Sequence, residues 1–429
     1  MLKNFRKHFS PLVLAFIFAL TGGIFAFAQN GASLSTKDQA DVFEDAWKLV
    51  NEKYYDPKLN GVDWASVREK YKPLVGNAKN DAEFYAIIKQ MLGEMKDAHT
   101  RFLTPREAYE FKTRQGTSVG IILDEVEGKP VVAKVAPDSE AGLANIKAGM
   151  IVQTIDNQPI AEKIKSVKAN LSESSSDRAS KIMLYRQLLD GEPETTVKIG
   201  LIDKDGKSFE TTLTRKVMSA QPKVSAGRLA SGIAYISINR FFSPVSQLFK
   251  KELEAAKDAP GLIIDLRYNG GGEIAEVVRI AGLLVNQKTS MGKVIFRGRE
   301  PSDLNFGENG KQIYAAPIVV LVNDASASGS ELLASGLQEA GRAEIVGERS
   351  CGCLLGIMNR RSMKGGGELH ISEMGFLSAK GKIYEKMGIT PDESVEQKIE
   401  DLQNGFDRDV AKAEKILAEM IRKGMAEVK

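Results

Sequence analysis

Ser328 is the residue that the sequence places best for nucleophilic attack. In the stretch NDASASGSELL, an apolar run typical of a buried strand leads into a serine-rich turn and then into a helix. A serine at such a junction would put a developing oxyanion near the free N–H groups and the positive end of the helix. Gly329 would supply one N–H, and Gly272 or Gly271, from the NGGG turn, would supply the other.

The two cysteines of the chain, Cys351 and Cys353, follow this helix and are one residue apart. That spacing is too tight for an unstrained disulfide, and two thiols without nearby histidines make a poor zinc site. We therefore interpret them as small residues packed near a strand end. The alternatives are a redox or reactive role for Cys353, including direct nucleophilic attack. As a base Cys353 would be poor, because a neutral thiol is weakly basic and a thiolate would repel an oxyanion.

The N-terminus has the pattern of a secretory signal peptide. Three basic residues precede an apolar run from Pro11 to Phe25, and the AFA sequence that ends at Ala28 suits signal peptidase. We expect cleavage after Ala28 and export to a periplasm or the extracellular side. The alternative, an uncleaved anchor, has fewer apolar residues than the ~20 that a spanning helix needs.

The charge balance argues against nucleic acid and anionic surfaces as partners. The chain has 59 basic and 56 acidic residues, and removing the three basic residues of the leader leaves 56 of each. A neutral chain of mixed charge has no electrostatic reason to bind polyanions. We expect no nucleic acid, no metal, no cofactor, and at most peripheral membrane association.

The elements around these residues change in character along the chain. Residues 35–56 predict a helix capped by Ser35 or Thr36 and stopped by Pro57, and a second helix follows over Asp81 to Met95. From about Ser118, short alternating strands with glycine turns predict a compact β module of about 100 residues with one longer helix.

The stretch from about 220 to 395 predicts a layered α/β core. Apolar strands such as GLIIDL and APIVVLV alternate with helices such as EIAEVVRIAGLLV. Strands that run directly into glycine or serine turns place functional residues at their carboxyl ends.

Beyond the core, apolar residues from Ile399 to Met420 recur at helical spacing, including Phe406 and Leu417. We expect this apolar stripe to dock on the core or on a second subunit.

The β module resembles a PDZ domain of the kind found in secreted proteases. The resemblance rests on VGI, a strand, VVAKVAPDSEAGLANIKAGMIVQTIDNQPI, a helix and two strands, in that order. It implies that the loop of Val119, Gly120 and Ile121 offers N–H groups to the terminal carboxylate of a peptide, which adds to the sheet as a strand. The alternative is a module that only braces the core.

Together with LIIDLRYNGGG, the SASGSE turn and GITPD, this order resembles the C-terminal processing peptidases, serine proteases of family S41. MLGEMKDAHTRFLTPREAYEF resembles the segment that these enzymes place ahead of their PDZ domain. The resemblance implies an α+β multidomain protein with a crotonase-like layered core. In chain order, we expect a signal peptide (1–28), an N-terminal helical domain (29–113), a PDZ domain (114–217), the peptidase core (218–395) and a C-terminal amphipathic helix (396–429).

The chain lacks the catalytic base that the Ser–Lys branch of this family uses. The position of the catalytic lysine holds Cys353, and that of a glutamine which orients the lysine holds Ile357. A second branch, which includes tricorn, uses serine, histidine and glutamate. That pattern implies His99, in DAHT, as base and Glu385, in EKMGITPD, as its orienting carboxylate; alternatively His99 is structural. As a base, His99 would titrate near pH ~6.5 if unperturbed.

Two functions of different class follow from this resemblance. The first is an exported serine endopeptidase that recognises protein substrates by their free C-termini and hydrolyses peptide bonds through Ser328. The second is an inactive homologue that serves as a PDZ peptide-binding adaptor. A crotonase-like acyl enzyme is disfavoured by the PDZ segment and the signal peptide. Oligomerisation through the C-terminal helix is a further expectation.

Overall fold

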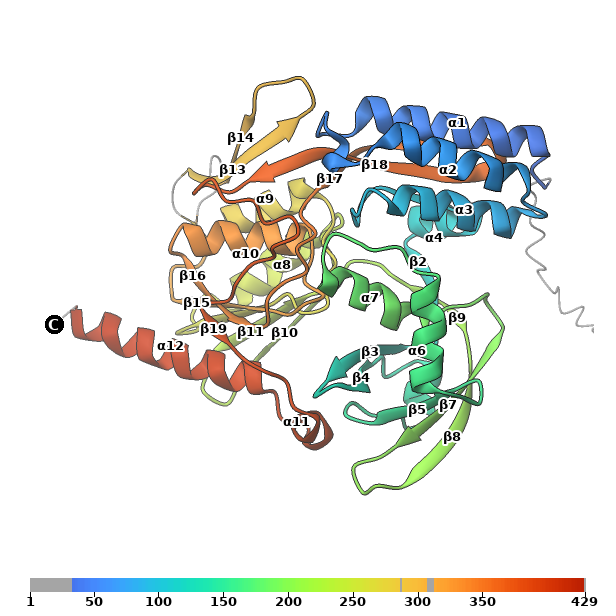
Figure 1. The fold of residues 1–429 in the computed structure, drawn as a ribbon. Coiled ribbons are helices and arrows are strands. Elements are labelled where there is room, and N and C mark those ends of the chain that lie inside the picture. Colours follow the sequence, from blue (N-terminus) through green and yellow to red (C-terminus); the bar gives the residue numbers. More distant parts are fainter. Residues whose placement is uncertain (1–32, 286–287, 307–311, 428–429) are drawn as a thin grey trace, which may run out of the picture. The chain divides into compact units, whose positions relative to one another are not determined.

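The computed structural model describes residues 33–285, 288–306 and 312–427 (Figure 1). The expected signal peptide, with cleavage after Ala28, lies outside these residues. None of the helices within the described ranges is both long and apolar enough to cross a membrane.

The first part of the chain is a layer of helices. As the sequence predicts, Ser35 caps the first helix, its hydroxyl accepting the Asp38 N–H. The second expected helix, from Asp81, is also present, but the sequence analysis missed a helix between the two, which carries Pro73 in its last turn. The helices are α1 (Thr36–Lys53), α2 (Trp64–Gly76), α3 (Asp81–Gly93) and α4 (Pro105–Thr113), with a 3-10 turn at Leu59–Gly61.

This helical layer packs on a sheet made largely from the end of the core. Leu369 and Ile371 of the central strand are fully buried against the apolar side chains of α1 to α3. His370 also lies in this strand. The strand order is β1-β18-β13-β14, with β17 also paired to β18; the bounds are β1 (Arg101–Leu103), β13 (Thr289–Phe296), β14 (Ser302–Phe306), β17 (Gly356–Ser362) and β18 (Glu368–Leu377).

The expected β module forms a separate sheet with its own apolar cluster. Hairpins turn at Gly128 and at Asp156–Asn157, and the sequence analysis, which expected one longer helix here, missed the helices α5 and α6. The sheet order is β3-β4-β5-β7-β8. The elements are β2 (Gln115–Ser118), β3 (Ile121–Val126), β4 (Lys129–Val135), α5 (Glu140–Leu143), β5 (Ile151–Ile155), β6 (Gln158–Pro159), α6 (Ile160–Ala169), α7 (Asp177–Gln187), β7 (Thr196–Ile202), β8 (Ser208–Thr214) and β9 (Lys216–Ser219).

The core is a mostly parallel sheet covered on both faces. Ile264 and Val320 face the helices α8 to α10, whereas Ile263 and Val319 face the last helix of the chain. This explains why these strands are apolar at every position. The sheet order is β10-β11-β12-β15-β16-β19, from β10 (Val224–Arg228), β11 (Ala234–Ile238), β12 (Leu262–Asp265), β15 (Ile318–Val322), β16 (Ala343–Gly347) and β19 (Glu393–Ser394); the helices are α8 (Val245–Ala255), α9 (Ile274–Gly282) and α10 (Gly329–Glu339).

The C-terminal stripe docks on this sheet, but it is not one helix. Gly405, with φ +67°, ends α11 (Ile399–Asn404) in a left-handed cap before α12 (Arg408–Glu427) begins. Leu417 is fully buried on the sheet, as expected. Phe406 was expected in the same stripe, but it follows the cap and is 51% exposed.

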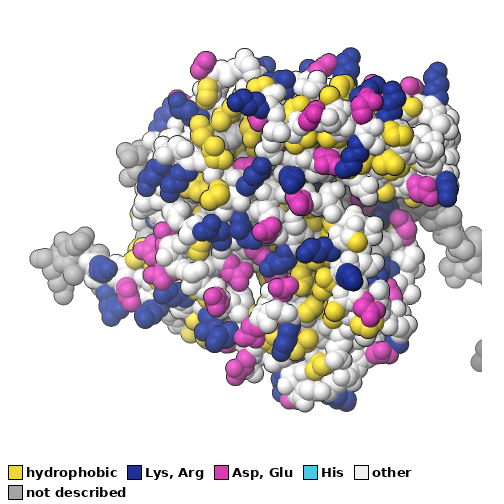
Figure 2. Space-filling view, in the orientation of Figure 1, with side chains coloured by type: hydrophobic (Ala, Val, Ile, Leu, Met, Phe, Trp, Pro, Cys, Tyr) yellow, Lys and Arg dark blue, Asp and Glu magenta, His cyan; other side chains and the backbone are white. Residues whose placement is uncertain are grey.

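Basic and acidic side chains are interspersed over the face shown in Figure 2. This agrees with the nearly equal numbers of the two kinds in the sequence.

We expect Leu417→Ala to lower the free energy of unfolding by about 2–5 kcal/mol, because truncation leaves a cavity between α12 and the sheet. The measurement is urea denaturation followed by circular dichroism. The matched control, Phe406→Ala, removes an exposed side chain and should change stability by only about 0.5 kcal/mol. Equal effects of the two substitutions would contradict the packing of α12 described above.

Candidate active site

Ser328 lies at the junction of β15 and α10, where the sequence places it. The turn before it is held by Ser326, whose buried hydroxyl accepts the Asn323 N–H at 2.9 Å and donates to the Leu266 carbonyl at 2.9 Å. The Ser330 hydroxyl donates to the Asn269 carbonyl at 2.8 Å. These two serines are therefore structural, and Ser328 is the half-buried serine between them.

The backbone of Ser328 is held in a conformation that few residues adopt. Its φ is 53° and its ψ is −111°. Its N–H lies 3.1 Å from the Cys353 carbonyl and 3.0 Å from Oε2 of Glu331. Backbone strain of this kind persists only when its surroundings enforce it, and it is concentrated at functional sites. A sharp turn from strand to helix is also how several hydrolases expose a nucleophilic serine.

The NGGG turn lies directly against Ser328. A Cβ on Gly271 would fall 2.7 Å from the Gly329 nitrogen and 2.7 Å from the Ser328 Cβ, so no side chain fits there. The Gly271 N–H donates to Asn269 Oδ1 at 2.9 Å. In contrast, the Gly272 and Gly329 N–H groups have no acceptor within the described part of the chain.

These free N–H groups are close to each other. A Cβ on Gly329 would lie 3.3 Å from the Gly272 nitrogen. Two adjacent free donors beside a serine at a helix start are what an oxyanion requires. Of the two alternatives that the sequence left open, Gly272 thus has a free N–H and Gly271 does not.

Glu331, in the first turn of α10, ties the serine turn to the loop after β16. Its buried carboxylate accepts four hydrogen bonds, from the N–H groups of Ser328, Gly352 and Cys353 and from the Ser350 hydroxyl, at 2.6 to 3.0 Å. Burial raises the pKa of Glu331, and these donors oppose that rise. The sequence analysis gave this residue no role, although Ser-x-x-Glu is a helix-capping spacing.

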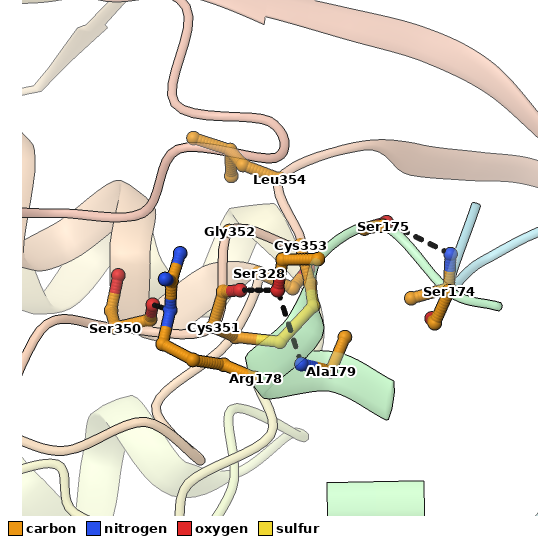
Figure 3. The surroundings of a disulfide bond; sticks show 12 residues. Ser174, Ser175, Arg178, Ala179, Ser328, Ser350, Cys351, Gly352, Cys353 and Leu354 are labelled. Carbon is orange, nitrogen blue, oxygen red and sulfur yellow. Dashed lines mark hydrogen bonds between the residues drawn. A yellow bond between two sulfur atoms is a disulfide. The ribbon is translucent and has the colours of Figure 1, made fainter. Parts of the chain in front are cut away.

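The expectation for the cysteines is wrong, because Cys351 and Cys353 form a disulfide (Figure 3). Gly352 between them has φ +75°, and this left-handed turn brings the two Cα atoms to 5.3 Å, within the range that a disulfide spans. Neither sulfur is then a thiol or thiolate, so neither can act as base, nucleophile or zinc ligand in this state.

The disulfide loop also contacts the β module. Figure 3 shows Arg178 and Ala179 of α7 beside it. The Arg178 Nε donates to the Ser350 carbonyl at 2.6 Å, and Ala179 packs on both cysteines. Thus the loop that holds Ser328 is bounded by α10 on one side and by α7 on the other.

His99 lies in the turn between α3 and β1, and its segment reaches the same loop. Ala98 and Ala327, the neighbours of His99 and Ser328, both pack on the disulfide cluster. No hydrogen bond joins His99 to Ser328 or Glu385 in the structure of the described residues. The His99 Nδ1 is buried without a partner, 4.0 Å from Oδ1 of Asp97.

Burial lowers the pKa of His99 to about 4, and the charge of Asp97 opposes this, while Arg101 and His370 lower the pKa further. The imidazole is therefore neutral over a wider pH range than the ordinary pKa of ~6.5 suggests.

The sequence analysis did not identify Asp97, which holds the turn that carries His99. Its Oδ1 accepts the backbone N–H of His99 at 2.8 Å and its Oδ2 accepts the Thr100 hydroxyl at 2.6 Å.

Glu385 lies in the segment after β18. It contacts Leu354, the residue that follows Cys353. Its Oε2 accepts the Leu354 N–H at 2.6 Å, and its Oε1 is buried without a hydrogen-bond partner. Burial, with a contribution from the charge of Asp97, raises the pKa of Glu385 to about 8. Glu385 is thus mostly protonated at neutral pH.

The loop expected to bind carboxylates precedes β3. Val119 is buried, the Gly120 N–H donates to the Ser118 hydroxyl at 2.9 Å, and Ile121 begins the edge strand of the module. Gly120, with φ +85°, sits where a Cβ would collide with Ser139. The outer edge of β3 has no strand partner in the ranges that the structure covers.

Comparisons with known proteins point to one family. Residues 232–395 match Peptidase family S41, and residues 35–93 match the Tricorn protease C1 domain. A "Carboxyl-terminal-processing protease" of Synechocystis is 28% identical over 394 residues, which cover 88% of this chain and 86% of the relative.

Solved structures give the same picture. A "Photosystem II D1 C-terminal processing protease" is 25% identical with a TM-score of 0.58, covering 87% of this chain and 98% of that chain. Mature CPAF in complex with lactacystin has a TM-score of 0.69 over 90% of this chain and 99% of that chain, at 12% identity, and so shows likeness of fold alone.

We expect Glu331→Gln to lower the free energy of unfolding by about 2–4 kcal/mol, because the amide nitrogen would face N–H donors that have lost a charged acceptor. Urea denaturation measures this. Glu254→Gln, at an exposed position on α8, is the matched control and should change stability by less than about 0.5 kcal/mol. An unaltered unfolding midpoint in Glu331→Gln would show that the four bonds do not support the fold.

Proposed function

With peptidase family S41 as the family that the comparisons support for this chain, we propose that the protein is an exported serine endopeptidase. Ser328 is the nucleophile, His99 the base, and protein tails with free C-termini are the substrates. The observation that carries this proposal is the position of Ser328 at the start of α10, beside the two free N–H groups of Gly272 and Gly329.

The proposed mechanism uses these residues in the following order. The Ser328 Oγ attacks the scissile carbonyl carbon and His99 takes the hydroxyl proton. The oxyanion is stabilised by the Gly272 and Gly329 N–H groups and by the positive end of α10. His99 then gives the proton to the leaving amine, and water, activated by the same imidazole, hydrolyses the acyl-enzyme.

His99 is favoured as base because the other candidate bases near Ser328 are engaged in other bonds. The residue at the position of the family's lysine, Cys353, is in a disulfide, and Lys181, the lysine of α7, is paired with Asp124 at 3.2 Å and with Asp324. His99 is brought to the loop by its neighbour Ala98. The absence of a hydrogen bond to Ser328 does not argue against this role, since such bonds often form only in the substrate complex.

We assign tail recognition to the β module, as a PDZ domain. The free edge of β3 lies beside α7, so a peptide could add as a strand between them. Two interactions join α7 to β3: the Lys181–Asp124 ion pair, and the hydrogen bond that the Tyr185 hydroxyl donates to Glu125 at 3.0 Å. A peptide bound between α7 and β3, with its C-terminus at Val119–Ile121, would lie next to both interactions.

Export fits the cysteine chemistry. A disulfide persists in oxidising compartments outside the cytoplasm. The Cys351–Cys353 bond is therefore consistent with the signal peptide expected over residues 1–28 and with a periplasmic or extracellular location.

The proposal is tested by Ser328→Ala. We expect the purified chain without residues 1–28 to cleave an unstructured protein substrate, and the variant to lower kcat by about 10⁴-fold or more. A fluorophosphonate probe should label the unsubstituted protein and miss the variant. Ser326→Ala is unsuitable as a control because Ser326 holds the turn, so exposed Ser231→Ala serves instead. Peptide binding without any cleavage would favour the adaptor function.

The pH dependence tests His99 and Glu385. Because the pKa of His99 is about 4, the base is neutral above that value, and activity should persist at pH 5.5 and fall only toward pH 4. His99→Ala should lower kcat by about 10²–10⁴-fold. Because the pKa of Glu385 is about 8, Glu385→Gln should match the parent enzyme at pH 6 and differ from it only above pH 8.

The measurement is kcat/KM from pH 4 to 10 for the three proteins. Wild-type activity that falls with a midpoint near pH 6.5 would contradict the lowered pKa of His99. A large loss of activity in Glu385→Gln at pH 6 would contradict a protonated Glu385.

A further inference from the structure

The carboxylate of Asp97 is fixed in place beside His99. Its Oδ1 accepts the His99 backbone N–H, and its Oδ2 accepts the Thr100 hydroxyl. The Thr100 oxygen in turn accepts the N–H of Ser372, on β18, at 3.1 Å. The Asp97 side chain is only 1% exposed. The carboxylate is therefore held between the turn that carries His99 and the central strand of the sheet.

His99 is the one basic side chain that approaches this carboxylate. Its Nδ1 lies 4.0 Å from Oδ1 of Asp97, and among the described residues no lysine or arginine lies within that distance. The buried Asp265 of the core, by contrast, is paired with Arg267 at 2.7 Å. When His99 takes up a proton, it is thus the group placed to offset the charge of Asp97.

The orientation of the His99 ring suits this partnership. Its Nδ1, on the side of Asp97, is buried without a hydrogen-bond partner. The side chain as a whole is 15% exposed, and Nε2 is not buried. In a catalytic triad, one ring nitrogen takes the proton of the serine and the other donates to a carboxylate. Nε2 is placed for the first task and Nδ1 for the second.

Glu385 is less suited than Asp97 to be that carboxylate. It lies more than 4.0 Å from the His99 ring nitrogens, and its Oε2 accepts the Leu354 N–H. Burial and the charges of Asp97 and Glu331 raise the pKa of Glu385 to about 8. Carboxyl groups that share a buried site do not all ionise at neutral pH, because their charges repel. Asp97 is therefore the charged partner and Glu385 the neutral one.

Two further basic groups face the imidazole. They are Arg101, at the start of β1, and His370, on β18. Burial has the largest effect on the pKa of His99 and lowers it, and these two groups lower it further. Asp97 is the charge that raises the pKa of His99, so it opposes all three. Asp97 thereby favours the imidazolium that forms when the base takes a proton.

Two tyrosines at the end of α1 complete the surroundings. Burial raises the pKa of Tyr54 and of Tyr55, to about 12 for Tyr55, and the charges of Asp97 and Glu385 add to the rise. Both phenols therefore stay neutral between pH 4 and pH 10. A change of activity within that range reports on the histidine and the carboxyl groups.

We propose that Asp97 positions His99 and stabilises the imidazolium that forms when Ser328 attacks. This is the role that the family resemblance implies for Glu385. A hydrogen bond from Nδ1–H of His99 to Oδ1 of Asp97 fixes the tautomer that leaves Nε2 free to take the serine proton. The distance of 4.0 Å shortens when substrate binds, as catalytic hydrogen bonds often do. The inference rests on the proposed function of His99 as base and adds the residue that acts through it.

The first test reads the tautomer of His99 directly. The chain without residues 1–28 keeps only His99 and His370 of its three histidines, so long-range proton–nitrogen NMR spectra at pH 7 show two imidazole patterns. His370→Gln assigns them. We expect His99 to carry its proton on Nδ1, and the share of that tautomer to fall in Asp97→Asn. The proton on Nε2 in the parent protein, or an equal share in both proteins, would overturn the proposal.

Thr100→Val is the matched control for a structural effect. It removes the hydroxyl bonded to Asp97 but keeps the charge of the carboxylate. We expect it to lower the thermal unfolding midpoint and to leave the tautomer of His99 unchanged. Spectra of Ser328→Ala should match those of the parent protein, which separates this result from the question of whether the protein cleaves peptides.

Kinetics provide the second test. At pH 6 we expect Asp97→Asn to lower kcat about 10²-fold or more with KM unchanged, whereas Glu385→Gln matches the parent enzyme. The acid limb of the kcat/KM profile of Asp97→Asn should move to lower pH, because the charge that raises the pKa of His99 is lost. A loss of kcat in Asp97→Asn no larger than that in Thr100→Val would assign Asp97 to the fold alone and overturn the proposal.

Discussion

The buried carboxylate of Glu331 is the interaction on which the candidate active site depends. It accepts hydrogen bonds from both sides of the site, from the serine turn and from the loop of residues 350–353. Without it, the Ser328 N–H would have only the Cys353 carbonyl to hold its unusual backbone conformation. A buried carboxylate that accepts four bonds is well compensated, whereas the three donors that would be left without an acceptor would cost several kcal/mol. The position of Ser328 is thus set by a buried residue at the first turn of α10.

The other parts of the site are gathered around the same loop. The Cys351–Cys353 disulfide gives it a compact apolar surface, on which the neighbours of His99 and Ser328 and the helix α7 pack. Glu385 binds the N–H of the residue that follows this disulfide. Segments from the N-terminal helical layer, the β module and the core therefore meet at one short loop.

Much of this could be predicted from local sequence, and the rest depends on tertiary contacts. The position of Ser328 could be predicted because an apolar strand runs directly into a helix there. The helix α1 could be predicted from its cap and its apolar periodicity, and the short strands of the β module from their glycine turns. The helix α2 was missed because Pro73 usually marks a helix boundary. The disulfide was missed because the approach of its cysteines depends on the left-handed φ of Gly352. The low pKa of His99 and the high pKa of Glu385 arise from burial and from distant charges, which spacing does not reveal.

The central claim, that Ser328 forms a covalent intermediate, is tested most directly by trapping that intermediate. The enzyme is mixed with an ester substrate that acylates quickly, quenched in acid within milliseconds, and its intact mass is measured, followed by mapping of the modified peptide. The account predicts a mass increase equal to one acyl group, located on Ser328 and absent from Ser328→Ala. Turnover of the ester with an acyl group on another residue, or with none at any quench time, would contradict it.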